Sequence, residues 1–388
     1  MLPAFPYTDA HQLNLDWILG SLKNITITQE DAERIQEIYA ELGPYVFKTV
    51  KTYGAIGDGV TDDSVAIQAC VDAEDIVIFP PGDYLIENRI MTAGPKIFIG
   101  YPLATILENN AWFSFSYASN ITLKNLIFDS KDVLPTTNVV FYRSKEILVD
   151  NCLFITGQNF NVQCSTCGNV TIRNCKMLHT VDSCALSLSL DPGFENTEYG
   201  RGGYTNISNC YFKNAGLDGI IANNYHVTIS NCIFEGCGTK TPAAGVYCNT
   251  KEDIKIIDCF IRDCTGNGMD LLYTNEIIID NCTIQDSKSA GIYLAECKRA
   301  SISNCSSIRN GADPIDATQD SGIVLAGGSP SDEIYISHCT IKNNAHNGIK
   351  LANATNCYID ACYLAGNTDG DIGGSGSYEA ADYTTVSI

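Results

Sequence analysis

Residues 254–294 read IKIIDCFIRDCTGNGMDLLYTNEIIIDNCTIQDSKSAGIYL and contain the same unit twice. Each unit begins with alternating apolar residues, continues through a Cys that follows Asp or Asn, and ends with Gly and a second alternating run. Alternation with a period of two is typical of β-strands, and Gly, Asn and Asp between the runs are typical of turns. The stretch therefore predicts short strands joined by tight turns.

The unit recurs along most of the chain, and an anchor cysteine marks it nine times. Successive anchors are 23, 35, 22, 27, 23, 23, 34 and 23 residues apart, at Cys152, Cys175, Cys210, Cys232, Cys259, Cys282, Cys305, Cys339 and Cys362. An earlier unit has Asn125 and Leu126 in the same places. Repeats of this length predict an all-β parallel β-helix of about ten rungs, because a leucine-rich repeat needs several Leu and a helical segment in each unit.

The composition excludes several classes of protein. The 388 residues include 45 acidic and 24 basic side chains, and the net charge of −21 argues against a nucleic-acid partner. The sequence has no apolar run long enough to cross a membrane, so we expect no membrane span. The first residues, MLPAFPY, lack the features of a secretory signal. Half of the 18 cysteines share one register, which predicts inward packing residues and mostly unpaired thiols.

Residues 48–95 predict a cap for the β-helix. Within them, YGAIGDGVTDDSVAIQAC at 53–70 places three glycines in a turn ahead of a short helix, and the apolar strand 76–79 is stopped by PPG at 80–82. A helix at this point would cover the open first rung of the column. Together with VIFPPGDYLI at 77–86, this motif resembles the pectate-lyase-like right-handed parallel β-helix proteins. The resemblance covers about residues 48–365, so we place the β-helix domain at 48–366 and a C-terminal tail or cap at 367–388.

That superfamily includes polysaccharide lyases and hydrolases, uronate epimerases, and bacteriophage tailspikes and appendages, so the resemblance implies a carbohydrate partner but no single reaction. Residues 1–47 predict two short helices, the first with Leu13, Trp17 and Leu22 and the second over 28–42. This segment is similar to the starts of tail or appendage proteins of phages that infect Gram-positive bacteria. The similarity implies attachment to phage tail proteins through residues 1–47 and a homotrimer; the alternative is a plain oligomerisation or packing segment.

A row of outward positions in the second strand of each unit carries the first candidate site. The residues two after each Gly are Ile221, Tyr247, Asp270, Tyr293, Val324 and Lys350. Tyrosine rings on either side of a carboxylate suit a sugar, because the rings cover its apolar faces while the acid serves chemistry. We predict Asp270 as a catalytic residue and Tyr247, Tyr293 and Lys350 as substrate-binding residues. The alternative is that Asp270 is one of many solvated acids.

Asp218 is the second candidate acid, because it stands directly before Gly219. In the polygalacturonases, which the chain resembles in part, a catalytic Asp occupies this kind of position. Ala243 and Ala244 stand where that family has an Asp pair, and its Gly-His-Gly and Arg-Ile-Lys motifs are missing, so that constellation is incomplete.

Two insertions, 191–204 and 311–320, lengthen the repeat and should leave the column as loops, where function tends to reside. The first contributes Glu195 and Arg201 as candidate substrate-binding residues. The acids of both loops could bind Ca²⁺. We expect no other metal or cofactor, because the five histidines are scattered and a single CxxC has no second pair.

These expectations combine into a phage tailspike or appendage protein, located in the virion or otherwise extracellular, that binds a bacterial surface polysaccharide. Whether it also hydrolyses that glycan stays open. Asp218 and Asp270 are two rungs, or about 10 Å, apart with a further offset along the strand, which is marginal because glycosidase carboxyls are separated by roughly 5–9.5 Å. The alternatives are a non-enzymatic structural or adhesive virion fibre and a bacterial polysaccharide hydrolase or lyase. A lyase is the weaker reading, since no basic cluster lies on the row.

Overall fold

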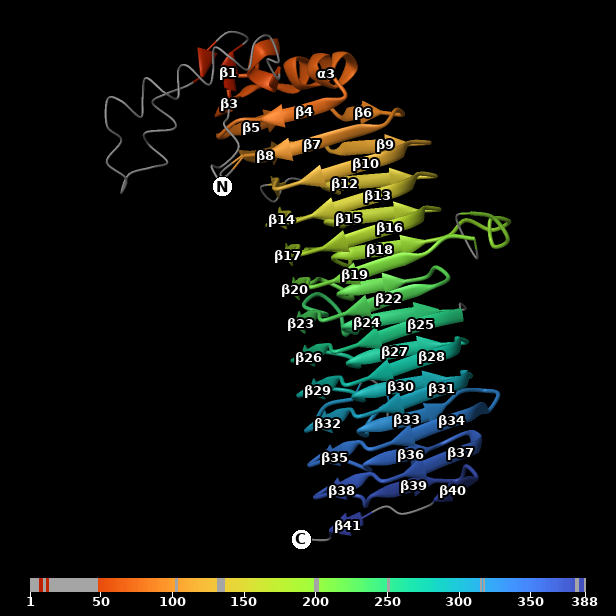
Figure 1. The fold of residues 1–388 in the computed structure, drawn as a ribbon. Helices are drawn as coiled ribbons and strands as arrows, with labels where there is room; N and C mark the ends of the chain where they lie inside the picture. The colour runs from red at the N-terminus through yellow and green to blue at the C-terminus, as the bar shows by residue number, and fades with distance from the viewer. Residues whose placement is uncertain are drawn as a thin grey trace, which may run out of the picture.

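The protein is described by a computed structural model that covers residues 7–9, 12–13, 48–380 and 384–386, apart from 102–103, 131–136, 199–201, 250–251, 315 and 317. The chain winds into a column whose turns stack from the N-terminal cap to the opposite end (Figure 1). Three sheets of 13, 14 and 12 strands form its walls, and all pairs within them are parallel. The predicted all-β parallel solenoid is therefore confirmed.

The 13-stranded wall, sheet I, consists of β4 (Ile76–Phe79), β7 (Lys96–Gly100), β10 (Ser119–Lys124), β13 (Lys145–Asp150), β16 (Gly168–Arg173), β19 (Thr205–Ser208), β22 (Val227–Ser230), β25 (Glu252–Ile257), β28 (Asn275–Asp280), β31 (Lys298–Ser303), β34 (Ser331–Ser337), β37 (Ala354–Asp360) and β40 (Tyr378–Ala380). The 14-stranded wall, sheet II, consists of β3 (Asp58–Asp62), β5 (Gly82–Ile86), β8 (Ala104–Glu108), β11 (Ile127–Asp129), β14 (Leu153–Phe154), β17 (Lys176–Leu178), β20 (Tyr211–Lys213), β23 (Ile233–Glu235), β26 (Phe260–Arg262), β29 (Thr283–Gln285), β32 (Ser306–Ile308), β35 (Thr340–Lys342), β38 (Tyr363–Ala365) and β41 (Thr384–Val386).

The 12-stranded wall, sheet III, consists of β6 (Ile90–Thr92), β9 (Phe113–Ser116), β12 (Val139–Tyr142), β15 (Val162–Ser165), β18 (Leu186–Ser189), β21 (Ile220–Ala222), β24 (Val246–Asn249), β27 (Met269–Leu272), β30 (Ile292–Ala295), β33 (Ile323–Ala326), β36 (Ile349–Leu351) and β39 (Ile372–Gly374). The chain runs from sheet I to sheet II to sheet III and then enters the next rung, so each rung is one turn of three strands.

The column has about thirteen rungs, so the prediction of about ten was wrong. The nine anchor cysteines and the earlier Asn125-Leu126 unit mark the rungs from β10 onward but miss β4–β6, β7–β9 and the last pair, β40 and β41. In the first of these rungs the corner between sheets I and II is Pro80-Pro81 rather than an Asn-Cys pair. The Asn-Cys signature therefore misses a rung whose corner between sheets I and II has another sequence.

The corner between sheets I and II explains the Asn-Cys signature. The nine residues before the anchor cysteines have φ between 49° and 55°, in the left-handed region that Asn and Asp tolerate best. The cysteine then points inward; Cys282 is 1% exposed, and its thiol donates to the Asp280 carbonyl at 3.3 Å. All 18 cysteines lie in the described residues, where they are buried and form no disulfide bond.

Close approach of successive rungs explains the Gly before each strand of sheet III. A Cβ at Gly245 would lie 2.9 Å from the carbonyl oxygen of Gly268, and one at Gly268 would lie 2.6 Å from that of Gly291. Any side chain here would push the rungs apart. The glycines therefore hold the corner between sheets II and III tight, and the residues just before them lie at the edge of sheet III.

The cap consists of the 3₁₀ helix η1 (Val50–Tyr53), strand β3 and helix α3 (Ser64–Ala73), and it lies over the first rung (Figure 1). Asp63 precedes the helix, but its carboxylate accepts the backbone N–H groups of Ile56 (2.6 Å) and Gly57 (3.0 Å) instead of capping α3. Ile67, Cys70 and Val71 of α3 are buried against the column. The predicted cap is thus present, and the Asp63 carboxylate closes the glycine turn.

The N-terminal segment is described only at β1 (Tyr7–Asp9) and β2 (Gln12–Leu13), which form an antiparallel pair. Leu13, which we expected in a helix, is in a strand. The rest of the two helices expected in 1–47, including the whole of 28–42, lies outside the described residues.

Candidate functional site

A pocket of about 240 Å³ opens at the corner between sheets II and III, where β21, β24 and β27 begin. It is lined by Leu217, Asp218, Pro242, Ala243, Ala244, Tyr247, Asn267 and Asp270. Both candidate acids predicted from the sequence therefore lie in one pocket, together with one of the two predicted tyrosines. Among the described residues, the lining contains no Lys or Arg.

Asp270 is placed by the alternation of β27. Its neighbours Met269 and Leu271 are fully buried in the core, so the carboxylate points outward. The register pairs Tyr247 with Asp270 and Asp270 with Tyr293, which is the row read from the sequence. Among the described residues, no donor reaches the Oδ1 atom of Asp270.

Asp218 is placed by the tight corner that precedes β21. Its Oδ1 accepts the backbone N–H of Ala244 at 2.8 Å. Ala244 belongs to the next rung, so this hydrogen bond draws the Asp218 carboxylate towards the rung of Asp270. The two acids are two rungs apart, and Asp270 lies three residues further along the strand direction than Asp218.

Burial perturbs both carboxyl groups in the same direction. It raises the pKa of Asp218 to about 6; the charge of Asp270 adds to this effect, and the hydrogen bond from Ala244 opposes it. Burial likewise raises the pKa of Asp270 to about 6, against an opposing hydrogen bond with Asn267. Two neighbouring carboxyls with such values can hold one proton between them near pH 6.

Two tyrosines flank the acid along the row. The Tyr247 hydroxyl accepts a hydrogen bond from the Asn249 amide at 2.9 Å. Tyr293 is 9% exposed, and burial followed by the charge of Asp270 raises its pKa. The ring of Tyr247 lines the pocket, whereas Tyr293 lies on the following rung.

Two residues of the site were not singled out from the sequence. Asn267, at 2% exposure, accepts the N–H of Ala290 at 3.0 Å and donates to the Oε1 of Gln319 at 3.0 Å. Gln319 comes from the insertion 311–320, which enters at the same corner as Asp218, between β32 and β33. The signal that could have revealed this residue is the position of the insertion within the repeat, ahead of the Gly of sheet III.

The remaining predicted residues are not in the pocket. Lys350 lies on the Asp270 row, three rungs further along, where its ammonium pairs with Asp320 at 2.9 Å. Glu195 lies in the loop after β18, which protrudes from the opposite edge of sheet III (Figure 1), and it accepts the N–H of Gly193 at 2.9 Å. Arg201 lies outside the described residues.

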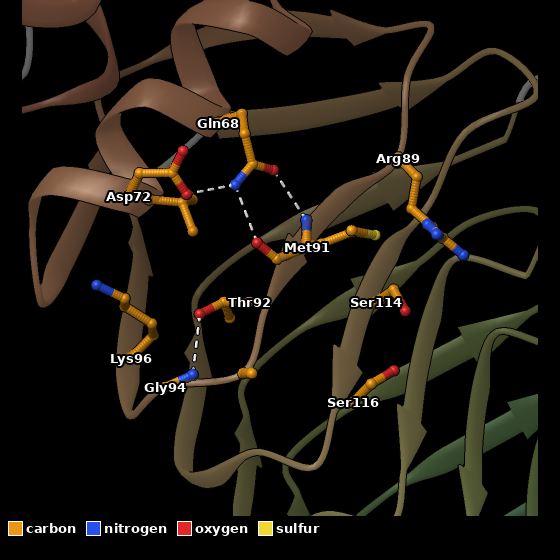
Figure 2. Close-up of a pocket in the computed structure, with 11 residues that line it drawn as sticks. Gln68, Asp72, Arg89, Met91, Thr92, Gly94, Lys96, Ser114 and Ser116 are labelled. Atoms are coloured by element: carbon orange, nitrogen blue, oxygen red, sulfur yellow. Dashed lines mark hydrogen bonds between the residues drawn. The ribbon is translucent and has the colours of Figure 1, made fainter.

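A larger cavity, of about 880 Å³, lies beside the cap (Figure 2). There Gln68 binds both the N–H and the carbonyl of Met91, at 2.9 and 3.0 Å, and donates to Asp72 at 2.7 Å. Arg89 and Lys96 also line this cavity, but Asp72 is its single carboxylate. It therefore lacks the acid pair that distinguishes the pocket of Asp218 and Asp270.

The described part of the chain has neither a cluster of metal-ligating side chains nor a membrane-spanning helix. There, no three His, Cys, Asp or Glu side chains gather closely enough to hold a metal ion. The acids of the second insertion are bonded within the protein, as when Asp316 accepts the N–H of Thr318 at 2.8 Å. None of the described helices has the length and apolar character to cross a membrane.

Two groups of known proteins resemble this chain in sequence or in fold. The chain is 28% identical over 203 residues to the pre-neck appendage protein of Bacillus phage B103, a match that covers 47% of this chain and 22% of the relative, so it spans only about a fifth of that protein. The N-terminal fragment of bacteriophage Phi29 gene product 12 has a TM-score of 0.60 at 14% identity, covering 91% of this chain and 68% of the fragment.

The second group contains carbohydrate-active proteins. The A-module of mannuronan C-5 epimerase AlgE6 from Azotobacter vinelandii has a TM-score of 0.65 at 15% identity and covers 88% of this chain and 99% of that module. Both structural likenesses are likenesses of fold.

Family profiles match the chain over most of its length. One, described as a right handed beta helix region, matches residues 195–369. The other, described as rhamnogalacturonase A/epimerase, pectate lyase-like, matches residues 47–270, which is more than half of the chain and includes both Asp218 and Asp270. The chain therefore belongs to the rhamnogalacturonase A/epimerase, pectate lyase-like family of right-handed β-helix proteins.

Proposed function

We propose that this chain is the β-helix of a phage tail appendage that binds and hydrolyses a polysaccharide of the bacterial cell surface. The observation that carries the proposal is the pocket in which Asp218 and Asp270, each with a pKa raised to about 6, lie beside the ring of Tyr247. Glycoside hydrolysis requires such a pair, one protonated and one ionised.

The two acids are assigned different roles. The hydrogen bond from Ala244 stabilises the ionised form of Asp218, which suits a base or nucleophile. The Oδ1 of Asp270, which no described donor reaches, is the place for a proton that is donated to the leaving-group oxygen. In a lyase, a cation would neutralise the uronate carboxylate, and the described lining residues supply none.

The substrate is proposed to lie along the row of sheet III. The ring of Tyr247 would cover a sugar ring beside the Asp270 rung, whereas Tyr293, at 9% exposure, would offer only a small contact on the other side. Lys350, three rungs or about 14 Å further along, would contact a more distant unit of the polymer. Glu195, in the loop at the opposite edge of sheet III, and Arg201, which lies outside the described residues, are proposed to contact the same glycan.

The placement in a virion is proposed from the phage relatives. A homotrimer would make weak glycan contacts multivalent, and residues 1–47 would join it to other tail proteins. A stable monomer in solution would contradict the trimer and would favour a solitary polysaccharide-degrading enzyme.

The experiment is a cleavage assay with the purified full chain on a panel of bacterial surface polysaccharides, in which new reducing ends and unsaturated uronates are measured separately. We expect reducing ends without unsaturation, and a loss of about 10²-fold or more in Asp218→Asn and in Asp270→Asn. Asp313→Asn is the matched control, because the Asp313 side chain is 78% exposed and lies outside the pocket. Unsaturated products would overturn the hydrolase in favour of a lyase, and binding without cleavage would leave an adhesive fibre.

A further inference from the structure

A second row of outward side chains runs down sheet I, on a different wall of the column from the acid pair. The register aligns Ile278 with Ser301, Ser301 with Tyr335, and Tyr335 with Tyr358. Tyr335 is 51% exposed, Ile278 39% and Tyr358 36%. This part of sheet I therefore presents two exposed aromatic rings next to a small side chain.

The two tyrosine rings form a stack that is open on one side. Their centroids are 4.8 Å apart and their planes differ by 10°, so Tyr358 covers one face of the Tyr335 ring. The other face points along the column towards Ser301, whose side chain is too small to cover it. A cavity of about 330 Å³ lies there, lined by Tyr335, Ser301 and Ile278 but not by Tyr358.

Charged groups surround this open ring face. Glu276, Arg299 and Glu333 each occupy a left-handed position, with φ of 57°, 55° and 57°, near the start of their strands. Such residues are left out of the strand register, and all three line the cavity. The Arg299 guanidinium lies 3.3 Å from the Glu276 carboxylate, which leaves both donors and acceptors at the rim.

The combination fits one class of ligand. A flat aromatic face binds the apolar face of a pyranose ring, and carboxylates and a guanidinium around it can bind the ring hydroxyls. Of the three carboxylates that line the cavity, Glu276 is paired with Arg299 and Asp253 with Lys255, at 3.3 and 3.0 Å. Among the described residues this leaves the charge of Glu333 uncompensated, which disfavours an acidic sugar and accepts a neutral or amino-substituted one.

We propose that the face of Tyr335 above Ser301, which we call the Tyr335 platform, is a second glycan-binding site that takes a neutral or amino-substituted pyranose. It lies on sheet I, whereas the acid pair lies at the start of sheet III, so it holds a polysaccharide without cleaving it. The choice of a surface polysaccharide as ligand rests on the proposed function, but binding at the platform does not require cleavage at the pocket.

The test uses the full chain with Asp218→Asn and Asp270→Asn, so that cleavage cannot remove the ligand. Retention is measured on immobilised neutral, amino-sugar-containing and uronate-containing polysaccharides. We expect retention on the first two classes to fall about tenfold with Tyr335→Ala and to persist with Tyr335→Phe. Ser301→Tyr extends the ring stack into the cavity and should block binding while the strand remains intact.

The control is Tyr363→Ala, because Tyr363 is 41% exposed but lies on sheet II. Unchanged retention in both Tyr335→Ala and Ser301→Tyr would overturn the platform, as would a parent protein that binds no neutral or amino polysaccharide. A change of oligomeric mass in these variants without a change in retention would overturn it too and would assign the surface to contacts between copies. Absence of cleavage by the wild-type chain would refute the hydrolase alone.

Discussion

Asp270 shows how a single residue can oppose the stability of the fold that carries it. The strand places its carboxylate at a half-buried position, and one of its oxygens lacks a hydrogen-bond donor among the described residues. Burial without full compensation makes the ionised form unfavourable, and the raised pKa expresses that cost. If this side chain only had to cover the surface, an uncharged Asn would cost less free energy than an Asp. The presence of Asp at position 270 therefore favours a chemical role.

We expect Asp270→Asn to stabilise the protein at neutral pH but not in acid. The folded-state pKa of Asp270 is raised from 3.8 to about 6, so the wild-type protein loses stability as the pH rises through this window. The variant avoids that loss, which amounts to at most about 3 kcal/mol in the free energy of unfolding above pH 7. Urea unfolding at pH 7.5 and pH 3.5 measures it; equal effects at both pH values, or destabilisation at pH 7.5, would contradict the raised pKa.

The pH dependence of cleavage tests the pair rather than the single residue. Because burial raises the pKa of each carboxyl to about 6, each is about half protonated near that pH, and one can be the acid while the other is the base. We expect a bell-shaped profile of kcat/KM with its maximum near pH 6, falling on the acid side as the base is protonated and on the alkaline side as the acid is lost. Initial rates between pH 4 and pH 9 measure it, and a rate that stays constant above pH 7 would rule out a protonated carboxyl as the acid.

The sequence was informative about the two acids to different degrees. Asp270 could be placed on a row with the tyrosines because the strand period and the Gly register determine which side chains stack. Asp218 was found through a resemblance to the polygalacturonases. The hydrogen bond from Ala244 and the contact of Gln319 with Asn267 could not be predicted, because they depend on the turn of the corner and on the path of an insertion.

At the scale of the element, the corner between sheets I and II carries the repeat. The residue before the anchor cysteine is a left-handed Asn, Asp or His in eight of the nine cases. In the ninth it is Ala361, with φ 49°. Amide ladders link several of these corners, as when Asn231 donates to Asn209 at 2.6 Å. Ala361 offers no such bond and bears the steric cost of its conformation.

We therefore expect Ala361→Asn to raise the free energy of unfolding by about 1 kcal/mol, since Asn tolerates the left-handed region better than Ala. The reverse change, Asn281→Ala, should lower it by a similar amount and also break the bond that Asn281 donates to Asp258 at 2.6 Å. Urea midpoints of the two variants give the comparison. A destabilised Ala361→Asn would show that another interaction at that corner outweighs the backbone.

Elements with a strong local signature were predicted well. The strand β4 has the expected bounds, 76–79, and α3 lies where the short helix was expected, between the glycine turn and β4. The first two rungs were missed because their corners lack the Asn-Cys pair, and strand pairing there depends on contacts between rungs rather than on a local motif. Gly57 in the cap illustrates such a contact, because a Cβ there would lie 2.9 Å from the ring of Tyr84.

At the scale of the whole molecule, one main core runs the length of the column, and nine of the 18 cysteines line it in one stack. Every cysteine is buried, and burial raises the pKa of the Cys297 thiol to about 12. Thiols in this state are poor nucleophiles and metal ligands. The cysteines thus serve as small apolar packing residues.

We expect a thiol reagent such as Ellman's reagent to react with almost none of the cysteines in the folded protein and with all 18 in urea. The reaction of unreduced and pre-reduced samples should agree in urea. A lower count in the unreduced sample would reveal disulfides between rungs, and rapid reaction of the folded protein would show that the column opens readily.

The hydrogen bonds between rungs run along the axis of the column, while the backbone itself winds around that axis. No covalent path therefore runs straight from one end to the other. Compression along the axis presses stacked side chains together and is resisted by the whole cross-section. A pull along the axis is instead concentrated on the bonds of one junction at a time, so the molecule behaves as a strut when it is pushed and as a coil that unwinds rung by rung when it is stretched.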